Sequence, residues 1–384
     1  MGVDMMTSPF GSDPDTLERV FGRRDGLLPL WVAEPSLPLA APIVEAITQR
    51  AATGWYGYEA RPQALYDAFT TWVSDRHGWD VTPLRRAVSP SVATSIGVLL
   101  EHLCAPGDGV VLQPPVFTDF KPLVTAAGTR VVRNALVLGE DGYAMDLEQL
   151  TEVTRSADVR ALILCNPHNP VGRVWRVDEL RGLAEVCAAN GVAVLADELH
   201  ADLVLSGHTF VPFAVAAQGT GVRWAAMHGP LKTFGLAGMS DTLLLTDDDD
   251  LRDAFARRSN QLHLTRNHVM QLPAMQAGYE HGSEWLDGLL TDTARRAQLL
   301  ADGFPDGVTL LPLEGTYLGW LDLRGLGMEV PELTRWLVDD AGLALSMGHW
   351  FGREGAGFAR ITLAVEDEFV AEAARRLAEA AARR

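Results

Sequence analysis

The chain has 384 residues, of which 47% are hydrophobic and 21% are charged, a composition typical of soluble globular proteins. One small core cannot organise a chain of this length, so we expect more than one domain. The formal net charge of −18 argues against nucleic acid or an anionic membrane surface as a partner, because both are polyanions.

Two further features predict a cytoplasmic protein. The first residues contain no basic stretch followed by an apolar run, and no run reaches the length of a membrane span. The three cysteines are far apart, form no CxxC pair and lie in apolar contexts, so we expect buried free thiols: Cys104, Cys165 and Cys187.

The predicted elements begin with an irregular arm over residues 1–27, which contains one short helix. From about residue 60 to 250, short apolar strands alternate with helical patterns, which predicts a largely parallel sheet with helices on both faces. The strands are expected at 108–115, 130–137, 159–165, 192–200, 223–229 and 241–247.

Two polar features of this region are interpreted as helix ends. An amphipathic helix is predicted over residues 177–191 and is closed by Gly191. The four aspartates at 247–250 suggest a metal site, but we interpret them as the cap of the next helix, where they complement its dipole. No metal is therefore predicted.

The carboxyl-terminal part has a different pattern. Strands are predicted at 316–324 and 357–365, with a helix over 331–341 and a final helix in the Ala- and Arg-rich tail. This mixture indicates a smaller α+β domain. We therefore predict a large α/β domain over residues 44–283, with the arm (1–43) and the small domain (284–384) built around it.

One motif, L-C-N-P-H-N-P-V-G-R-V-W at 164–175, follows directly on a predicted buried strand. Pro167, Pro170 and Gly172 fix a tight, non-helical loop at the carboxyl end of that strand. Ligands bind at this edge of open α/β sheets. Taken alone, the motif is equally compatible with an ordinary connection between a strand and a helix.

Two later segments place polar side chains at other strand ends. Asp197 and His200 follow an apolar strand in A-D-E-L-H, where a carboxylate requires a cation or hydrogen-bond donors. Lys232, in G-P-L-K-T-F-G-L-A-G, lies between two apolar strands. It is either a surface charge or a buried amine with a lowered pKa, suited to Schiff-base chemistry.

Together, N-P-x-N-P-x-G, D-E-x-H, K-T-F-x-x-A-G and a late F-x-R resemble the fold-type I enzymes of pyridoxal 5′-phosphate (PLP). The sequence is most similar to the cystathionine β-lyase/C–S lyase group of the class I/II aminotransferase superfamily, and the matching stretches run from residue 28 to about 365. The resemblance implies a mostly parallel seven-stranded sheet, PLP as cofactor and a homodimer with shared active sites.

The resemblance also assigns roles around the cofactor ring. Lys232 matches the lysine that binds PLP as a Schiff base, and Asp197 the carboxylate that pairs with the pyridinium nitrogen. Asn169 and His200 match positions next to the phenolic oxygen. Phe117 matches the aromatic residue that stacks on the ring.

Further roles concern the phosphate and the substrate. Residues 91–93, which are Ser91, Val92 and Ala93, match the turn whose amides receive the phosphate at a helix N-terminus. Tyr58 matches a tyrosine that reaches the phosphate in the neighbouring subunit. Arg360 matches the arginine that grips the substrate carboxylate.

The sequence departs from the family pattern at four places. Leu231 precedes the lysine where serine is usual, and His228 replaces a small hydroxyl residue, so we expect phosphate binding to rely on Tyr58, residues 91–93 and His228. Phe117 replaces a tyrosine and cannot act as an acid or base. A-E-P-S-L at 33–37 replaces A-D-M-D-F on the substrate side, which hints at an unusual substrate.

The predicted activity is that of a C–S lyase, which converts a cysteine S-conjugate to thiol, pyruvate and ammonia. Two alternatives stay open: transamination, and a decarboxylating or oxidative reaction on an S-linked cysteine, as in lincosamide-type antibiotic biosynthesis. A regulatory, non-enzymatic role is disfavoured because no DNA-binding arm is visible and the net charge is negative.

Overall fold

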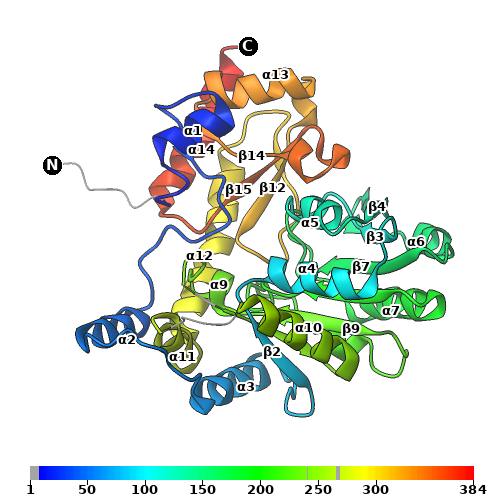
Figure 1. Cartoon of the computed structure of the whole chain (residues 1–384). Helices are drawn as coiled ribbons and strands as arrows, with labels where there is room; N and C mark the ends of the chain where they lie inside the picture. Colours follow the sequence, from blue (N-terminus) through cyan, green and yellow to red (C-terminus); the bar gives the residue numbers. More distant parts are fainter. Residues whose placement is uncertain (1–7, 240, 265–268) are drawn as a thin grey trace.

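The computed structural model describes residues 8–239, 241–264 and 269–384 (Figure 1). A seven-stranded sheet has the order β2–β10–β9–β8–β7–β3–β4. Strand β10 is antiparallel to both of its neighbours, and β9, β8, β7, β3 and β4 are mutually parallel. The predicted α/β fold with a mostly parallel seven-stranded sheet is confirmed. Its strands are β2 (Arg85–Ser89), β3 (Gly109–Leu112), β4 (Arg130–Arg133), β7 (Val159–Cys165), β8 (Ala193–Asp197), β9 (Trp224–His228) and β10 (Thr242–Thr246).

Helices cover both faces of this sheet, which explains why its central strands are apolar along their whole length. Side chains from alternate strand positions therefore enter two different cores, one on each face. On one face lie α4 (Val92–Leu103), α5 (Phe120–Ala126) and α10 (Asp249–Leu262), and on the other α6 (Leu147–Thr154), α7 (Val177–Asn190) and α8 (Phe213–Ala216).

Both predicted helix ends are confirmed. Gly191 ends α7 in the left-handed region, with φ 67°. The Asp248 carboxylate accepts hydrogen bonds from the amides of Asp250 and Leu251 at the start of α10, so the aspartate run is a cap. Within the described ranges, no cluster of three or more His, Cys, Asp or Glu side chains could hold a metal ion.

Two predictions need correction. The strand expected at 130–137 ends at Arg133, and β5 (Val137–Gly139) instead forms a hairpin with β6 (Gly142–Ala144). The neighbouring strand β3 itself ends shortly before Pro114 and Pro115, which have no amide hydrogen to donate to the ladder. Directly after β4, the Asn134 side chain accepts a hydrogen bond from Gln113 and donates one to the Asp146 carbonyl. Cys104 is only half-buried because it is the C-cap of α4, whereas the other two thiols are buried as expected.

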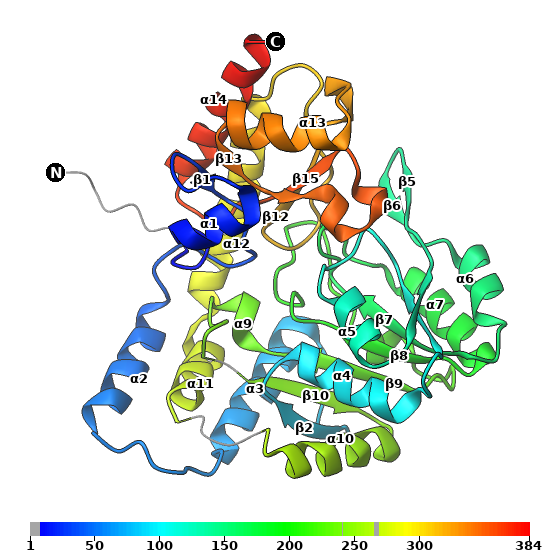
Figure 2. The ribbon, with the colours of Figure 1, turned by 45° about the horizontal axis from the view of Figure 1, so that its top comes forward.

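The small domain is built on an antiparallel sheet of order β11–β12–β15–β14. The amino-terminal arm joins it, because β1 (Leu28–Pro29) pairs with β13 (Leu343–Ala344) (Figure 2). Its other elements are α1 (Pro14–Phe21), α12 (Ser283–Asp302), β11 (Thr309–Leu310), β12 (Leu318–Asp322), α13 (Val330–Arg335), β14 (Ser346–Met347), β15 (Phe358–Thr362) and α14 (Asp367–Ala382). The helix expected at 331–341 continues after α13 as one π-helical stretch, Trp336–Asp340.

The strand positions are compatible with the predicted domain boundaries. The seven strands of the large sheet fall within 44–283, and the four strands of the small sheet fall within 284–384. We therefore propose the same division of the chain. The short helix α9 (Pro230–Thr233) follows β9. Three longer helices pack together beside the β10 side of the large sheet: α2 (Ala41–Ala52), α3 (Gln63–His77) and α11 (Gln271–His281) (Figure 1). None of the helices in the described part of the chain is long and apolar enough to cross a membrane.

Candidate active site

A cavity of about 170 Å³ lies at the carboxyl ends of the parallel strands. Its walls come from the start of α4, the segment before α5, the loops after β7 and β8, and α9. Ligands bind at this edge of open α/β sheets. Eight residues singled out from the sequence line the cavity together: Ser91, Val92, Ala93, Phe117, Asn169, Asp197, His200 and Lys232.

Lys232 is a buried amine rather than a surface charge. Its Nζ donates a hydrogen bond of 2.7 Å to the Ala33 carbonyl, in the segment between β1 and α2. Burial lowers the pKa of Lys232, and the positive charge of Arg360 lowers it further. A neutral amine is therefore more accessible than on an ordinary lysine, which is the requirement for a nucleophile or a base.

Asp197 is the last residue of β8, His200 lies in the loop after it, and both are buried. Burial raises the pKa of Asp197 to about 6, and the Leu199 amide donates a hydrogen bond of 3.1 Å to its carboxylate. A buried carboxylate of this kind is stabilised by a cationic partner. Burial lowers the pKa of His200 well below its usual value, with the charge of Lys232 as a second cause, so its ring is neutral.

Arg360 reaches the site from β15, in the small domain. One guanidinium nitrogen donates to Asn169 Oδ1 at 3.0 Å, and the other donates to the Trp31 carbonyl at 2.8 Å and Ser346 Oγ at 3.1 Å. Its guanidinium carbon lies 5.0 Å from the centre of the Phe351 ring. Burial lowers the pKa of Arg360 to about 10, so it stays charged at neutral pH. The structure thus links a cation that can bind a carboxylate to Asn169, in the loop of the 164–175 motif.

The start of α4 provides a site for an anion. Ser91 is the N-cap, and its Oγ accepts a hydrogen bond of 3.1 Å from the Thr94 amide. The first turn of a helix leaves N–H groups without intrahelical partners, and these groups bind phosphate. Val92 and Ala93 belong to this turn and line the cavity.

Comparison with known proteins decides what kind of site this is. The family model described as aminotransferase class I and II matches residues 36–377. The chain belongs to this family. Cystathionine beta-lyase PatB of Bacillus subtilis (strain 168) is 33% identical over 351 residues, which are 90% of this chain and 90% of PatB. Protein MalY of Escherichia coli (strain K12) is 30% identical over 347 residues, 89% of this chain and 88% of MalY.

Solved structures agree with this membership. Cystalysin from Treponema denticola, whose crystal structure contains PLP, is 25% identical with a TM-score of 0.90, and the match covers 99% of both chains. The family is PLP-dependent, which confirms the predicted cofactor and the fold-type I architecture.

The residues of the cavity fit the family's cofactor. Lys232 would supply the amine that binds it, and Asp197 would supply the carboxylate for a protonated pyridine nitrogen. The buried His200 Nδ1 has no hydrogen-bond partner in the structure, so it is free to bond a group in the cavity. The α4 amides suit a phosphate, and Phe117 provides an aromatic wall.

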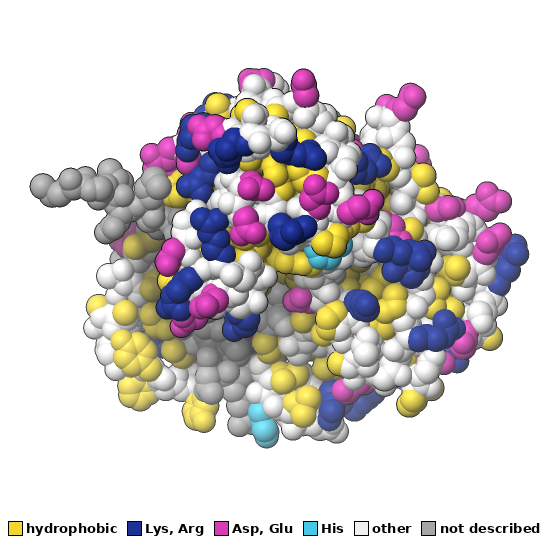
Figure 3. Space-filling view, turned by 90° about the horizontal axis from the view of Figure 1, so that it is seen from above, with side chains coloured by type: hydrophobic (Ala, Val, Ile, Leu, Met, Phe, Trp, Pro, Cys, Tyr) yellow, Lys and Arg dark blue, Asp and Glu magenta, His cyan; other side chains and the backbone are white. Residues whose placement is uncertain are grey.

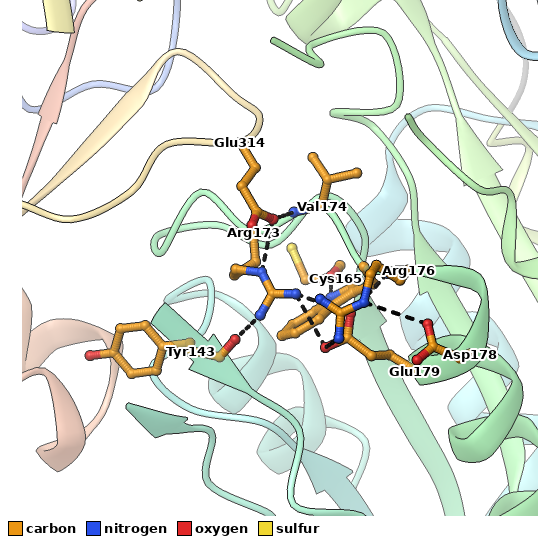
Figure 4. A network of polar contacts seen from close by, with 9 residues as sticks. Tyr143, Cys165, Arg173, Val174, Arg176, Asp178, Glu179 and Glu314 are labelled. Atoms are coloured by element: carbon orange, nitrogen blue, oxygen red, sulfur yellow. Dashed lines mark hydrogen bonds and ion pairs between the residues drawn. The ribbon is translucent and has the colours of Figure 1, made fainter. Parts of the chain in front are cut away.

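The motif loop is held from behind by a buried arginine (Figure 4). Arg173 Nε donates to Glu314 at 2.8 Å, its Nη2 donates to Glu179 at 3.0 Å, and its Nη1 donates to the Tyr143 carbonyl. Glu314 also accepts from the Val174 amide at 2.9 Å. The loop that carries Asn169 is therefore tied to α7 and to the segment before β12, which keeps its cavity side in place.

A second network, centred on Asp202, was missed by the sequence reasoning. The Asp202 carboxylate accepts hydrogen bonds from His77 at 2.8 Å, Trp72 at 2.9 Å and Thr233 at 2.7 Å. Thr233 follows Lys232 directly, so this carboxylate fixes the short helix α9 that carries Lys232. The available signal was a third acidic residue in this segment, two positions after His200.

The prediction that His228 helps to bind phosphate is wrong. Its ring donates to Glu198 at 2.7 Å and packs against aromatic residues of α3 and neighbouring loops, on the face of the sheet opposite to the cavity. Side chains alternate along a strand, and in β9 Met227 enters the core on the cavity side. Leu231 does line the cavity.

Tyr58 also lies away from the cavity of its own chain. Its side chain belongs to the connection between α2 and α3 and is 82% exposed. The assignment of Tyr58 to the phosphate of a neighbouring subunit therefore stays a prediction.

Proposed function

We propose that this chain is a PLP-dependent C–S lyase that performs β-elimination on a cysteine S-conjugate. The proposal rests on one observation above all: Lys232, a buried amine with a lowered pKa, lines the same cavity as Asn169, and the Asn169 side chain holds the guanidinium of Arg360 at 3.0 Å. Relatives named cystathionine beta-lyase, PatB among them, support it.

The role of Arg360 is to orient the substrate. Its charged guanidinium is held by the Trp31 carbonyl, Ser346 and Asn169, so its direction is set before the substrate enters. A substrate carboxylate gripped there is kept from turning freely, which presents the α-hydrogen rather than the carboxylate to the base.

The role of Lys232 is to move the proton. When bound, PLP supplies an electron sink that stabilises negative charge at the substrate's Cα. The lowered pKa increases the fraction of Lys232 that is unprotonated and so able to accept the α-proton. The electron pair at Cα then forms a double bond to Cβ, and the Cβ–S bond breaks to release the thiol. With one water consumed, the remainder becomes pyruvate and ammonia.

A labelled substrate separates this reaction from its alternatives. An S-alkyl cysteine that carries deuterium at Cα and a label in the carboxyl group is expected to give pyruvate that keeps the carboxyl label and has lost the deuterium. Early release of labelled carbon dioxide would favour the decarboxylating alternative, as in lincosamide-type biosynthesis. Conversion of bound cofactor to its amino form, with a keto acid that retains sulfur, would favour transamination.

We also propose a homodimer in which each active site uses Tyr58 of the partner subunit. The large exposure of Tyr58 and of its neighbours Trp55 and Tyr56 supports an interface there. A mixture of Tyr58→Phe and Lys232→Ala variants that exchange subunits is expected to recover activity, because each hybrid has one intact site. If mixing restores nothing, sites are not shared. The free thiols support a reducing, cytoplasmic location.

A further inference from the structure

A second cavity, of about 280 Å³, adjoins the cofactor cavity, and Phe117 forms part of the wall of both. One side of it comes from the end of β3 and the segment leading into α5, and the other from the 349–353 loop of the small domain. The two sides are joined by a hydrogen bond of 3.0 Å from the Val116 amide to the Phe351 carbonyl. The cavity is thus part of the junction between the domains.

The cavity has apolar walls and a cationic rim. Its walls include Pro114, Val116, Trp350 and Phe351, and its charged lining residues are Lys121, Arg133 and Arg353. On the face seen in Figure 3, Lys and Arg side chains lie around a hydrophobic patch to the right of centre. A cavity with apolar walls and a cationic rim is suited to bind a short hydrocarbon chain that ends in an anionic group.

The charges at this rim are only partly neutralised. Arg133 donates a hydrogen bond to Glu354, and Arg353 lies 3.4 Å from the same carboxylate. One negative charge is therefore shared by two arginines. Lys121 is exposed and makes no ion pair with the described residues. Asp119 lines the adjacent cavity. The excess of positive charge is notable in a chain whose formal net charge is −18.

Lys121 and Lys232 are the two lysines of the whole sequence. One lines the cofactor cavity, and the other lines the cavity next to it. Phe351, which forms a wall of the second cavity, also contacts the guanidinium of Arg360. A substrate held at its α-carboxylate by Arg360 therefore has the second cavity within reach of its sulfur substituent.

We propose that the second cavity binds the thiol side of the substrate, and that this side carries an anionic group recognised by Lys121 and the neighbouring arginines. The inference rests on the proposed lyase function for its substrate class and adds the chemistry of the leaving thiol. Cysteine S-conjugates of short carboxyalkyl thiols are then the preferred substrates over neutral or cationic conjugates of the same length.

The test compares two nearly isosteric ligands: S-(2-carboxyethyl)-L-cysteine and its neutral side-chain amide. Binding is measured by titration calorimetry in the Lys232→Ala background with PLP present, in which turnover is blocked. We expect the carboxylate to bind about tenfold more tightly, since a hydrogen bond to a charged group is worth more than a neutral one. Lys121→Gln in the same background should reduce this preference to about threefold or less, and Lys121→Arg should largely keep it.

The control is Arg258→Gln, which removes one positive charge from an exposed arginine in α10, paired with Glu101 at 3.0 Å. This variant should retain the full preference. The inference would be overturned if the Lys232→Ala parent bound the carboxylate and the amide with nearly equal affinity. It would also be overturned if Lys121→Gln left the preference for the carboxylate unchanged. Pyruvate release by the unmodified enzyme is assayed separately. Its absence with both compounds rejects the lyase proposal. The ratio of the two binding affinities still tests whether the second cavity binds an anionic group.

Discussion

Replacing Asp197 by asparagine is expected to stabilise the protein without cofactor and to weaken its hold on PLP. Burial raises the pKa of this carboxyl from 3.8 to about 6, because few donors face the ionised form: the Leu199 amide is one, and Lys232 contributes charge. Without a cofactor, an ionised Asp197 is therefore a cost to the folded state at neutral pH.

The size of that cost follows from the pKa. A shift of about two units corresponds to about 3 kcal/mol, at about 1.4 kcal/mol per unit. The folded chain binds this proton more tightly than the unfolded chain, so stability falls as pH rises from about 4 to about 6, and the full cost is present above that window. The unfolding entropy is about 2.1 cal/mol/K per residue, and the chain has 384 residues. Dividing about 3 kcal/mol by the total entropy gives a change in melting temperature of about 4 °C.

The assay is differential scanning calorimetry of cofactor-free protein between about pH 5 and pH 8, followed by the same scans with PLP added. Asp197→Asn should melt about 4 °C above wild type at the upper end of this range and by less at the lower end. On addition of PLP the order should reverse, because only the carboxylate pairs with a pyridinium. The exposed Asp306→Asn is the control and should change neither scan.

Two outcomes would refute this reasoning. The first is a cofactor-free Asp197→Asn variant that is no more stable than wild type at any pH in the range. The second is an equal gain in melting temperature for both proteins when PLP is added, which would show that Asp197 does not meet the cofactor's charge.

Two other predictions concern networks behind the site. Arg173→Met should lower the free energy of unfolding by about 3–5 kcal/mol, because it removes the buried cation between Glu179 and Glu314 and leaves these carboxylates only Arg176 and backbone amides as partners. Urea unfolding measures this change, and a loss below about 1 kcal/mol would contradict the importance of the network. Hydrogen bonds from His77, Thr233 and Trp72 outweigh burial and lower the pKa of Asp202, so its stabilisation is present at neutral pH and is lost as pH falls. Asp202→Asn should therefore reduce the loss of stability that accompanies acidification. It should also shift the pH at which the absorbance of the bound cofactor changes. An unaltered pH dependence of the absorbance would show that Asp202 contributes to folding but not to the site.

Several features of the protein were determined by the sequence alone. Short apolar runs such as 161–165 favour strands covered on both faces, and polar groups that follow parallel strands meet at one edge of the sheet. The resemblance to fold-type I PLP enzymes then predicted that Asn169, Asp197 and Lys232 share one site, and all three line a single cavity. Caps at Asp248 and Gly191 were likewise predictable, because they depend on neighbouring backbone groups only.

Other features depended on contacts between segments far apart in the chain. Whether His228 faces the cavity depends on the register of β9 in the sheet, where a shift of one residue exchanges the two faces. The carbonyls of Trp31 and Ala33 hold Arg360 and Lys232, yet backbone acceptors carry no sequence signature. Arg133 and Arg353 meet at one carboxylate because the domains pack there. Tertiary structure alone decided these pairings, since they arise from which surfaces become neighbours after the elements have formed.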